Sequence, residues 1–143
     1  MKLKIKRIDR ELPLPEYKTG GAVAFDLYSR EDKVIKPGKT ELLPSNLIIE
    51  IPKGFFIMTA SRSSTHKRGL LMANGVGIWD QDFHGAEDEW QVPLYNFSRQ
   101  TVVVKRGERI AQAVLIPIHK ANWQEITEAK KKSRGGFGST GKK

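Results

Sequence analysis

The sequence lacks cysteine entirely among its 143 residues. A disulfide framework, a thiolate zinc site and a cysteine nucleophile are therefore all excluded. Its three histidines have no metal-ligand spacing among themselves or with Asp and Glu, so we expect no metal site built from protein side chains alone. The apolar runs reach only about five to six residues, whereas a membrane helix needs about 20.

The sequence also shows no secretory signal. Residues Met1 to Arg10 alternate Lys with Leu and Ile, and they contain no continuous apolar stretch. A chain of this length fits one domain that buries roughly two-thirds of the surface of its unfolded form. We therefore expect a cytoplasmic, single-domain protein, located in the host cytoplasm if the source is a virus.

Acidic residues are scarce, and at the C-terminal end they are absent. Lys and Arg outnumber Asp and Glu by 25 to 16, which gives a net charge of +9. Residues 129–143 hold six basic and no acidic side chains, and four glycines fall between Arg134 and Gly141. Ordering so many glycines costs much chain entropy. We expect a β domain over residues 1–128 and a flexible Gly/Lys-rich segment over residues 129–143.

Helical periodicity is hard to find, and short apolar runs with period two take its place. Gly and Pro punctuate these runs, as in an all-β sandwich or barrel. The runs lie at 3–5, 47–51, 55–60, 70–73, 90–95, 101–104 and 110–118. One short helix is expected from Ser63 to Arg68, with Ser61 or Ser63 as its N-cap and Gly69 closing it.

Residues 74–85 contain two carboxylates, Asp80 and Asp82, between glycines. One interpretation is an ordinary hairpin turn, in which Asp and Gly are common. The other is a carboxylate general base beside a tight glycine hairpin whose backbone approaches a ligand. The residues alone leave both interpretations open.

Three further segments also have two interpretations each. Residues 61–65 combine hydroxyls with a guanidinium, which suits either an oxyanion cradle or a serine-capped helix. Residues 106–112 indicate a β-turn with a surface ion pair, although Gln112 within an apolar run needs hydrogen-bond partners. Residues 130–143 indicate a solvated chain end or an RNA-binding segment of the Arg-Gly-Gly type.

Taken in chain order, five segments resemble the five motifs of the trimeric dUTP pyrophosphatase (dUTPase) family. They are residues 24–29, 61–64, 74–85, 107–112 and 134–141, which together extend over nearly the whole chain. The resemblance implies a jelly-roll-like β-barrel that forms a homotrimer, with each active site assembled from three chains. It also implies dUTP as the small-molecule substrate and no nucleic-acid or membrane partner.

The resemblance assigns chemistry to individual residues. Asp80 matches the general base that activates water for attack on the α-phosphorus, giving dUMP and pyrophosphate. Asp26 matches the acid that organises the site and its hydrated Mg²⁺, which the family binds through the triphosphate and water. Such a reaction keeps uracil out of DNA and supplies dUMP for dTMP synthesis. The residues matched to substrate binding are Arg62, Ser63, Ser64, Asn74, Gly77, Ile78, Phe83, Gln112, Arg134, Phe137, Gly138, Ser139 and Thr140.

The matched residues divide by the part of the substrate that they would contact. Asn74, Gly77 and the neighbouring backbone match the uracil reader. Arg62, Ser63, Ser64 and Gln112 match the phosphate cradle. In the last motif, Phe137 would stack over uracil while Arg134 and the Ser139–Thr140 pair meet the γ-phosphate.

The chain departs from the family pattern at several positions. Phe83 stands where the family usually has Tyr beneath the deoxyribose, so a ring remains but the phenol hydrogen bond is lost. Trp79 replaces a usual aliphatic residue. The fifth motif is shortened between Arg and Phe, which makes Lys132 a second candidate for the role of Arg134.

Three alternatives remain beside this interpretation. A dCTP deaminase, or a bifunctional deaminase and dUTPase of the same fold, needs a catalytic glutamate where this chain has Asp80 and Asp82. A nucleotide-sensing protein without activity is suggested by Phe83, but the retained Asp80 argues against it. An RNA-binding β-barrel with a basic tail would lose affinity steeply with salt.

Overall fold

The computed structural model describes residues 1–136, and in this range the fold is almost entirely β. Eleven strands and one 3-10 helix are present among these residues, which confirms the predicted all-β class. None of the helical structure in residues 1–136 is long and apolar enough to cross a membrane. The matched residues Phe137, Gly138, Ser139 and Thr140 lie outside the described range.

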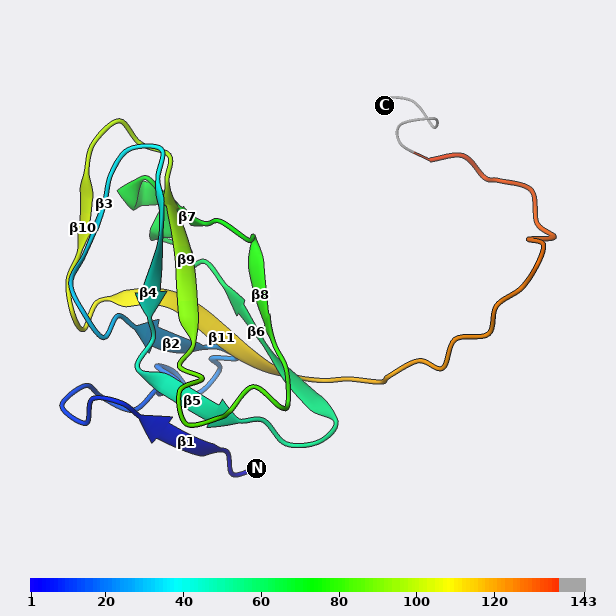
Figure 1. Cartoon of the computed structure of the whole chain (residues 1–143), viewed down its shortest axis with the longest axis horizontal. Helices are drawn as coiled ribbons and strands as arrows, with labels where there is room; N and C mark the ends of the chain where they lie inside the picture. Colours follow the sequence, from blue (N-terminus) through cyan, green and yellow to red (C-terminus); the bar gives the residue numbers. More distant parts are fainter. Residues whose placement is uncertain (137–143) are drawn as a thin grey trace.

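The strands form four antiparallel sheets (Figure 1). The largest has the order β2 (Phe25–Tyr28), β11 (Arg109–Pro117), β6 (Phe55–Ala60) and β8 (Val76–Trp79). A three-stranded sheet has the order β4 (Thr40–Pro44), β9 (Gln91–Asn96) and β7 (Leu70–Met72). Two pairs complete the fold: β1 (Lys4–Arg7) with β5 (Leu47–Glu50), and β3 (Lys33–Ile35) with β10 (Val102–Val104).

The period-two pattern produces the core. In β9, Val92 and Leu94 are fully buried, while Pro93 and Tyr95 lie half-buried on the other face. Successive side chains of a strand point to opposite faces, so one face of each sheet is apolar. Each fully buried Val or Leu side chain stabilises the fold by about 1.5–3 kcal/mol.

The apolar runs found in the sequence correspond to β1, β5, β6, β7, β9, β10 and β11. Four strands, β2, β3, β4 and β8, were not among them. β3 has only three residues, with a single buried side chain, Ile35, at its end. β8 contains Gly77, which contributes no side chain to a hydrophobic pattern.

The predicted helix is shorter and begins later than expected. It is a 3-10 helix, η1 (Thr65–Arg68), with Ser64 at the N-cap position and no capping hydrogen bond from that side chain. The caps predicted at Ser61 and Ser63 were therefore wrong. The hydroxyl of Thr65 accepts the Arg62 backbone N–H at 3.0 Å and so stabilises the chain's entry into the helix. Gly69 ends the helix at φ 74°, as predicted.

The turn after β7 is not the predicted hairpin. Gly75 adopts φ 71°, and the Val76 N–H donates to the Asn74 carbonyl at 2.8 Å. The strand before this turn pairs with β9 and the strand after it pairs with β6. The turn therefore leads the chain from one sheet into another.

The chain leaves the β body after β11. Every residue from 119 to 136 is exposed, and this part forms neither strand nor helix. Figure 1 shows the segment running away from the sheets. Trp123 is 93% exposed within it, and Arg134 lies near the end of the described range.

Candidate functional site

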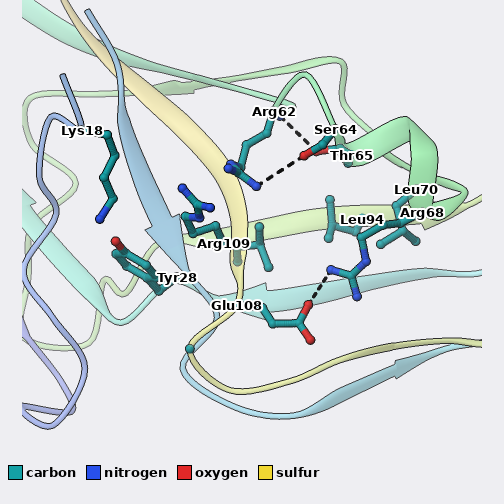
Figure 2. Close-up of a pocket in the computed structure, with 12 residues that line it drawn as sticks. Lys18, Tyr28, Arg62, Ser64, Thr65, Arg68, Leu70, Leu94, Glu108 and Arg109 are labelled. Atoms are coloured by element: carbon teal, nitrogen blue, oxygen red, sulfur yellow. Dashed lines mark hydrogen bonds and ion pairs between the residues drawn. The ribbon is translucent and has the colours of Figure 1, made fainter. Parts of the chain in front are cut away.

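A cavity of about 350 Å³ lies beside β2, β11 and η1 (Figure 2). We call it the arginine cavity. Four cationic side chains and one carboxylate belong to its wall: Lys18, Arg62, Arg68, Arg109 and Glu108. Such an excess of positive charge suits a ligand with several negative charges.

Asp26 holds two of these arginines in place. The Nε atom of Arg62 donates to Asp26 Oδ1 at 2.7 Å, and Nη1 of Arg109 donates to Asp26 Oδ2 at 3.1 Å. The Asp26 side chain is only 12% exposed, so these ion pairs are partly shielded from water. Figure 2 shows both guanidinium groups on the same side of β11, and their remaining N–H groups are able to donate to an anion.

The serines of the second motif divide between the cavity and its surroundings. Ser64 lines the arginine cavity, and its Oγ lies 3.5 Å from Arg62 Nη1. Ser63 is exposed and is not among the lining residues. The first serine, Ser61, accepts the Met72 backbone N–H at 3.2 Å through its Oγ. That bond ties the start of the segment to β7.

Gln112 has the partner that its place in an apolar run required. It lies in β11 between Asp26 on β2 and Ala60 on β6. Its Nε2 atom donates to the Ser61 carbonyl at 3.0 Å. Gln112 thereby fixes the backbone just before Arg62, which confirms the prediction that its amide needs a partner.

Several residues of the arginine cavity were not predicted as site residues. Arg109 lies within the fourth motif, of which only Gln112 was predicted as a site residue. Arg68 donates to Glu108 and connects η1 with the turn before β11. Lys18 lies in the loop between β1 and β2, which has no periodic pattern. A hydrogen bond to the Glu16 carboxylate raises the pKa of the Lys18 amine and keeps the amine charged.

A second cavity, of about 410 Å³, lies at the opposite end of β6. We call it the aspartate cavity. Its wall consists of Phe55, Phe56, Asp80, Gln81, Asp82, Ile118 and Lys120. Asp80 and Asp82 are exposed, and within residues 1–136 neither carboxylate has a hydrogen bond or an ion pair. Gln81 between them donates to the Phe55 carbonyl at 2.9 Å and anchors the turn.

The length of β6 separates Asp80 in the aspartate cavity from Arg62 in the arginine cavity. Trp79 pairs with Ile57, so Asp80 follows beside Phe56 at the start of β6. Arg62 comes two residues after the end of the same strand. At about 3.3 Å per residue, the four steps from Phe56 to the end of β6 at Ala60 alone span roughly 13 Å. A single chain therefore presents Asp80 and Arg62 to different spaces.

The remaining matched residues lie along β8 and beyond it. Gly77 is buried opposite Thr59, and an added Cβ would lie 2.3 Å from Thr59 Oγ1. Ile78 is 57% exposed on the outer face, and Asn74 is exposed in the preceding turn. Phe83 packs against Trp79 and is not part of the aspartate-cavity wall. Arg134 lines neither cavity.

Comparisons with known proteins find similarity to one family along nearly the whole chain. The dUTPase family model matches residues 10–141. A deoxyuridine 5'-triphosphate nucleotidohydrolase of Nautilia profundicola is 42% identical over 145 residues, covering 99% of this chain and 100% of its own length.

Two solved structures have the same fold. A variant dUTPase of Staphylococcus bacteriophage 80alpha with dUpNHpp has a TM-score of 0.83 at 21% identity, covering 98% of each chain. A variant dUTPase from phage phi11 of S. aureus, described with a structural Mg(II) ion, has a TM-score of 0.81 at 18% identity, covering 92% of this chain and all of its own. At these identities the likeness supports the fold alone.

Proposed function

The chain belongs to the dUTPase family and is a dUTP nucleotidohydrolase, and we propose that it cleaves dUTP to dUMP and pyrophosphate by water attack on the α-phosphorus. The observation that carries the mechanism is the division of charge between the two cavities. One holds cations organised around Asp26, and the other holds two exposed carboxylates. Removing dUTP in this way would keep uracil out of DNA and supply dUMP for dTMP synthesis.

Asp80 is proposed as the general base. A base must be ionised and within reach of the water whose proton it takes. The Asp80 carboxylate is exposed on its cavity and, among residues 1–136, is bound by no cation that would compete for its lone pairs. Asp82 shares that exposure, but the family motif matches Asp80 to the catalytic position.

The arginine cavity is proposed as the phosphate cradle. Arg62 and Arg109 have guanidinium forks fixed by Asp26, and Ser64 adds a hydroxyl. Charge-assisted bonds from such donors to phosphate are about twice as strong as neutral ones. Ser63 and Gln112 complete the matched set, Gln112 by holding the backbone before Arg62.

We further propose that each active site combines different copies of the chain in a homotrimer. One substrate has to meet Asp80 and Arg62 together, yet within one chain these residues lie at opposite ends of β6. A second copy that brings its arginine cavity to the first copy's aspartate cavity would remove this separation. Symmetric assembly would then complete every site in the same way.

The base, sugar and lid contacts complete the proposal. The backbone around Asn74, Gly77 and Ile78 would read the uracil edge, and Phe83 would exclude the ribose hydroxyl. Residues 1–128 would form the catalytic domain, and residues 129–143 would close over the substrate as a lid. Arg134, or Lys132 in its place, would meet the γ-phosphate; the lid residues from Phe137 onward lie outside the described range.

Mg²⁺ is proposed as the cofactor, bound through the triphosphate and water. Residues 1–136 contain no group of three or more His, Cys, Asp or Glu that could hold a metal ion. Mg²⁺ prefers oxygen ligands and keeps several waters, so a substrate-borne ion fits these residues. When bound, it would neutralise phosphate charge, while Asp26 keeps the arginines in position.

The reaction is tested by measuring pyrophosphate release from dUTP with Mg²⁺, beside dCTP, dTTP and UTP, and by identifying the nucleotide product. Release from dUTP alone, giving dUMP, is the expected result. Ammonia from dCTP would indicate a deaminase instead. Tight dUTP binding without turnover would indicate a sensor and would overturn the role of Asp80.

Shared sites are tested by mixing two inactive variants. Asp80→Asn and Arg62→Ala chains, unfolded together and refolded, should regain activity in about a quarter of their sites, because each site draws its two residues from chains taken at random. Each variant refolded alone is the control. A mixture as inactive as its components would contradict a site built from two copies.

A further inference from the structure

Trp79, which replaces the aliphatic residue usual in the third motif, forms a stack with another tryptophan. Its ring centroid lies 4.4 Å from that of Trp90, and the two planes differ by 12°. Trp90 is fully buried in the core. The indole of Trp79 thus rests on a partner that is itself held by surrounding core side chains.

Two further contacts hold the Trp79 indole. Its Nε1 donates to Thr59 Oγ1 at 3.2 Å, and Thr59 is only 1% exposed on β6. Gly77 lies on the same face of β8, where an added Cβ would come within 3.4 Å of Trp79 Nε1. Stacking and hydrogen bonding together leave the indole little freedom to rotate.

Phe83 is the outermost ring of this stack. Its centroid lies 5.8 Å from Trp79, with the planes tilted by 38°, and 40% of the residue is exposed. The Phe83 N–H donates to the Asp80 carbonyl over a long 3.4 Å. Since a phenylalanine has no hydroxyl to fix its ring by a hydrogen bond, the ring's position depends on packing against Trp79.

We propose that Trp79 is a positioning residue that fixes the Phe83 ring and thereby sets the preference for dUTP over UTP. The inference rests on the proposed function and extends it to the basis of sugar selectivity. Excluding one hydroxyl by steric contact requires a ring held to within about 0.5 Å, which loosely packed loop side chains do not achieve. The stack from Trp90 through Trp79 provides that restraint.

The test is a double-mutant cycle on selectivity, using Trp79→Leu, Phe83→Ala and the double variant. The measured quantity is kcat/KM for dUTP divided by kcat/KM for UTP. Partial unfolding lowers both values equally and leaves their ratio unchanged. In Trp79→Leu we expect this ratio to fall about two- to twelvefold, which corresponds to the interaction energies of aromatic pairs.

The cycle has two decisive controls. In the Phe83→Ala background, Trp79→Leu should change the ratio no further, because the ring that it positions is gone. Trp79→Phe, which keeps a ring against Phe83, should restore most of the ratio, and Trp123→Phe should not alter it. An unchanged ratio in Trp79→Leu, or the same fall with and without Phe83, would overturn the inference.

Measuring binding separates this inference from the proposed function. The same cycle is measured as the ratio of dissociation constants for UMP and dUMP by calorimetry. If the wild-type chain shows no turnover but its binding ratio depends on Trp79 through Phe83, only the proposed reaction fails. If dUTP is hydrolysed and neither ratio changes in Trp79→Leu, only the positioning role fails.

Discussion

In the arginine cavity each arginine has a carboxylate partner within the chain, since Asp26 binds Arg62 and Arg109 while Glu108 binds Arg68. In the aspartate cavity, Asp80 and Asp82 have no ion pair among residues 1–136. Under the proposed mechanism, this difference separates two tasks. Binding phosphate requires donors that are already oriented, which internal ion pairs provide. Accepting a proton requires a carboxylate whose lone pairs remain available.

Replacing Asp80 by Asn should have the largest effect. The amide keeps the size of the side chain but does not accept a proton, so we expect kcat to fall by about 10²–10⁴-fold, the usual contribution of a general base. Pyrophosphate release measures this loss. Calorimetric titration with a non-hydrolysable dUTP analogue should show affinity that is retained.

Asp82→Asn is the matched control for that variant, because its carboxylate is also exposed on the same cavity. It should keep kcat within a few-fold of the wild type, as surface substitutions away from the chemistry usually do. The assignment would be reversed if Asp82→Asn were inactive and Asp80→Asn active.

Replacing Arg62 by Ala should have the second largest effect. It removes a guanidinium fork and leaves Asp26 with Arg109 as its remaining ion-pair partner. We expect kcat/KM for dUTP to fall about 10²-fold, typical of losing one charge-stabilising donor. Arg99→Ala, an exposed arginine in the loop after β9, is the control and should be neutral. A loss below about threefold in Arg62→Ala would remove Arg62 from the cradle.

Replacing Gly77 by Ala tests how tightly β8 packs against β6. The new Cβ would meet Thr59 Oγ1 at 2.3 Å, so the buried Thr59 side chain or one of the two strands has to shift. We expect the free energy of unfolding to fall by about 1–3 kcal/mol, as in other overpacked cores. Urea denaturation measures this change. Gly20→Ala, with nothing within 4 Å of its added Cβ, should leave stability nearly unchanged and so identify crowding as the cause.

The smallest effect concerns the turn that leads into β11. The pKa of Asp9 is lowered mainly by a hydrogen bond from the Arg106 side chain and further by one from the Glu11 backbone N–H. The pKa of Asp32 is lowered mainly by a hydrogen bond from the Arg106 backbone N–H and further by one from the Lys105 side chain. Each carboxylate therefore adds stability above its ordinary pKa of 3.8, and this is lost as the pH falls through the lower folded value. We expect the Tm to fall below about pH 4, and to fall less steeply in Arg106→Ala. A parallel decline in both proteins, measured by circular dichroism, would contradict this.

Much of the fold and part of the site follow from the sequence. Alternation reveals β9 because Val92 and Leu94 both face the core, and the apolar run around Gln112 predicts that its amide has a partner. β3 escapes detection because only Val34 and Ile35 are apolar there, and β8 because Gly77 contributes no side chain to a hydrophobic pattern.

What the sequence cannot reveal depends on sheet register. The pairing of Trp79 with Ile57 places Asp80 at one end of β6 and Arg62 beyond the other, and no spacing along the chain encodes that distance. Asp26 meets Arg62 and Arg109 only because β2 and β11 are neighbours. The helix start was mispredicted for a local reason. The Thr65 hydroxyl accepts the backbone N–H of Arg62, and no serine side chain caps the helix.

The length of β6 has a consequence for the life of the protein. Under the proposed assembly, a newly synthesised chain holds both halves of the chemistry but keeps them apart, and so it is latent. Activity then begins with the encounter of copies and needs neither an inhibitor nor a cleaved precursor. On dilution, the specific activity should decline as the assembly dissociates, so the onset of hydrolysis would depend on the concentration of the chain.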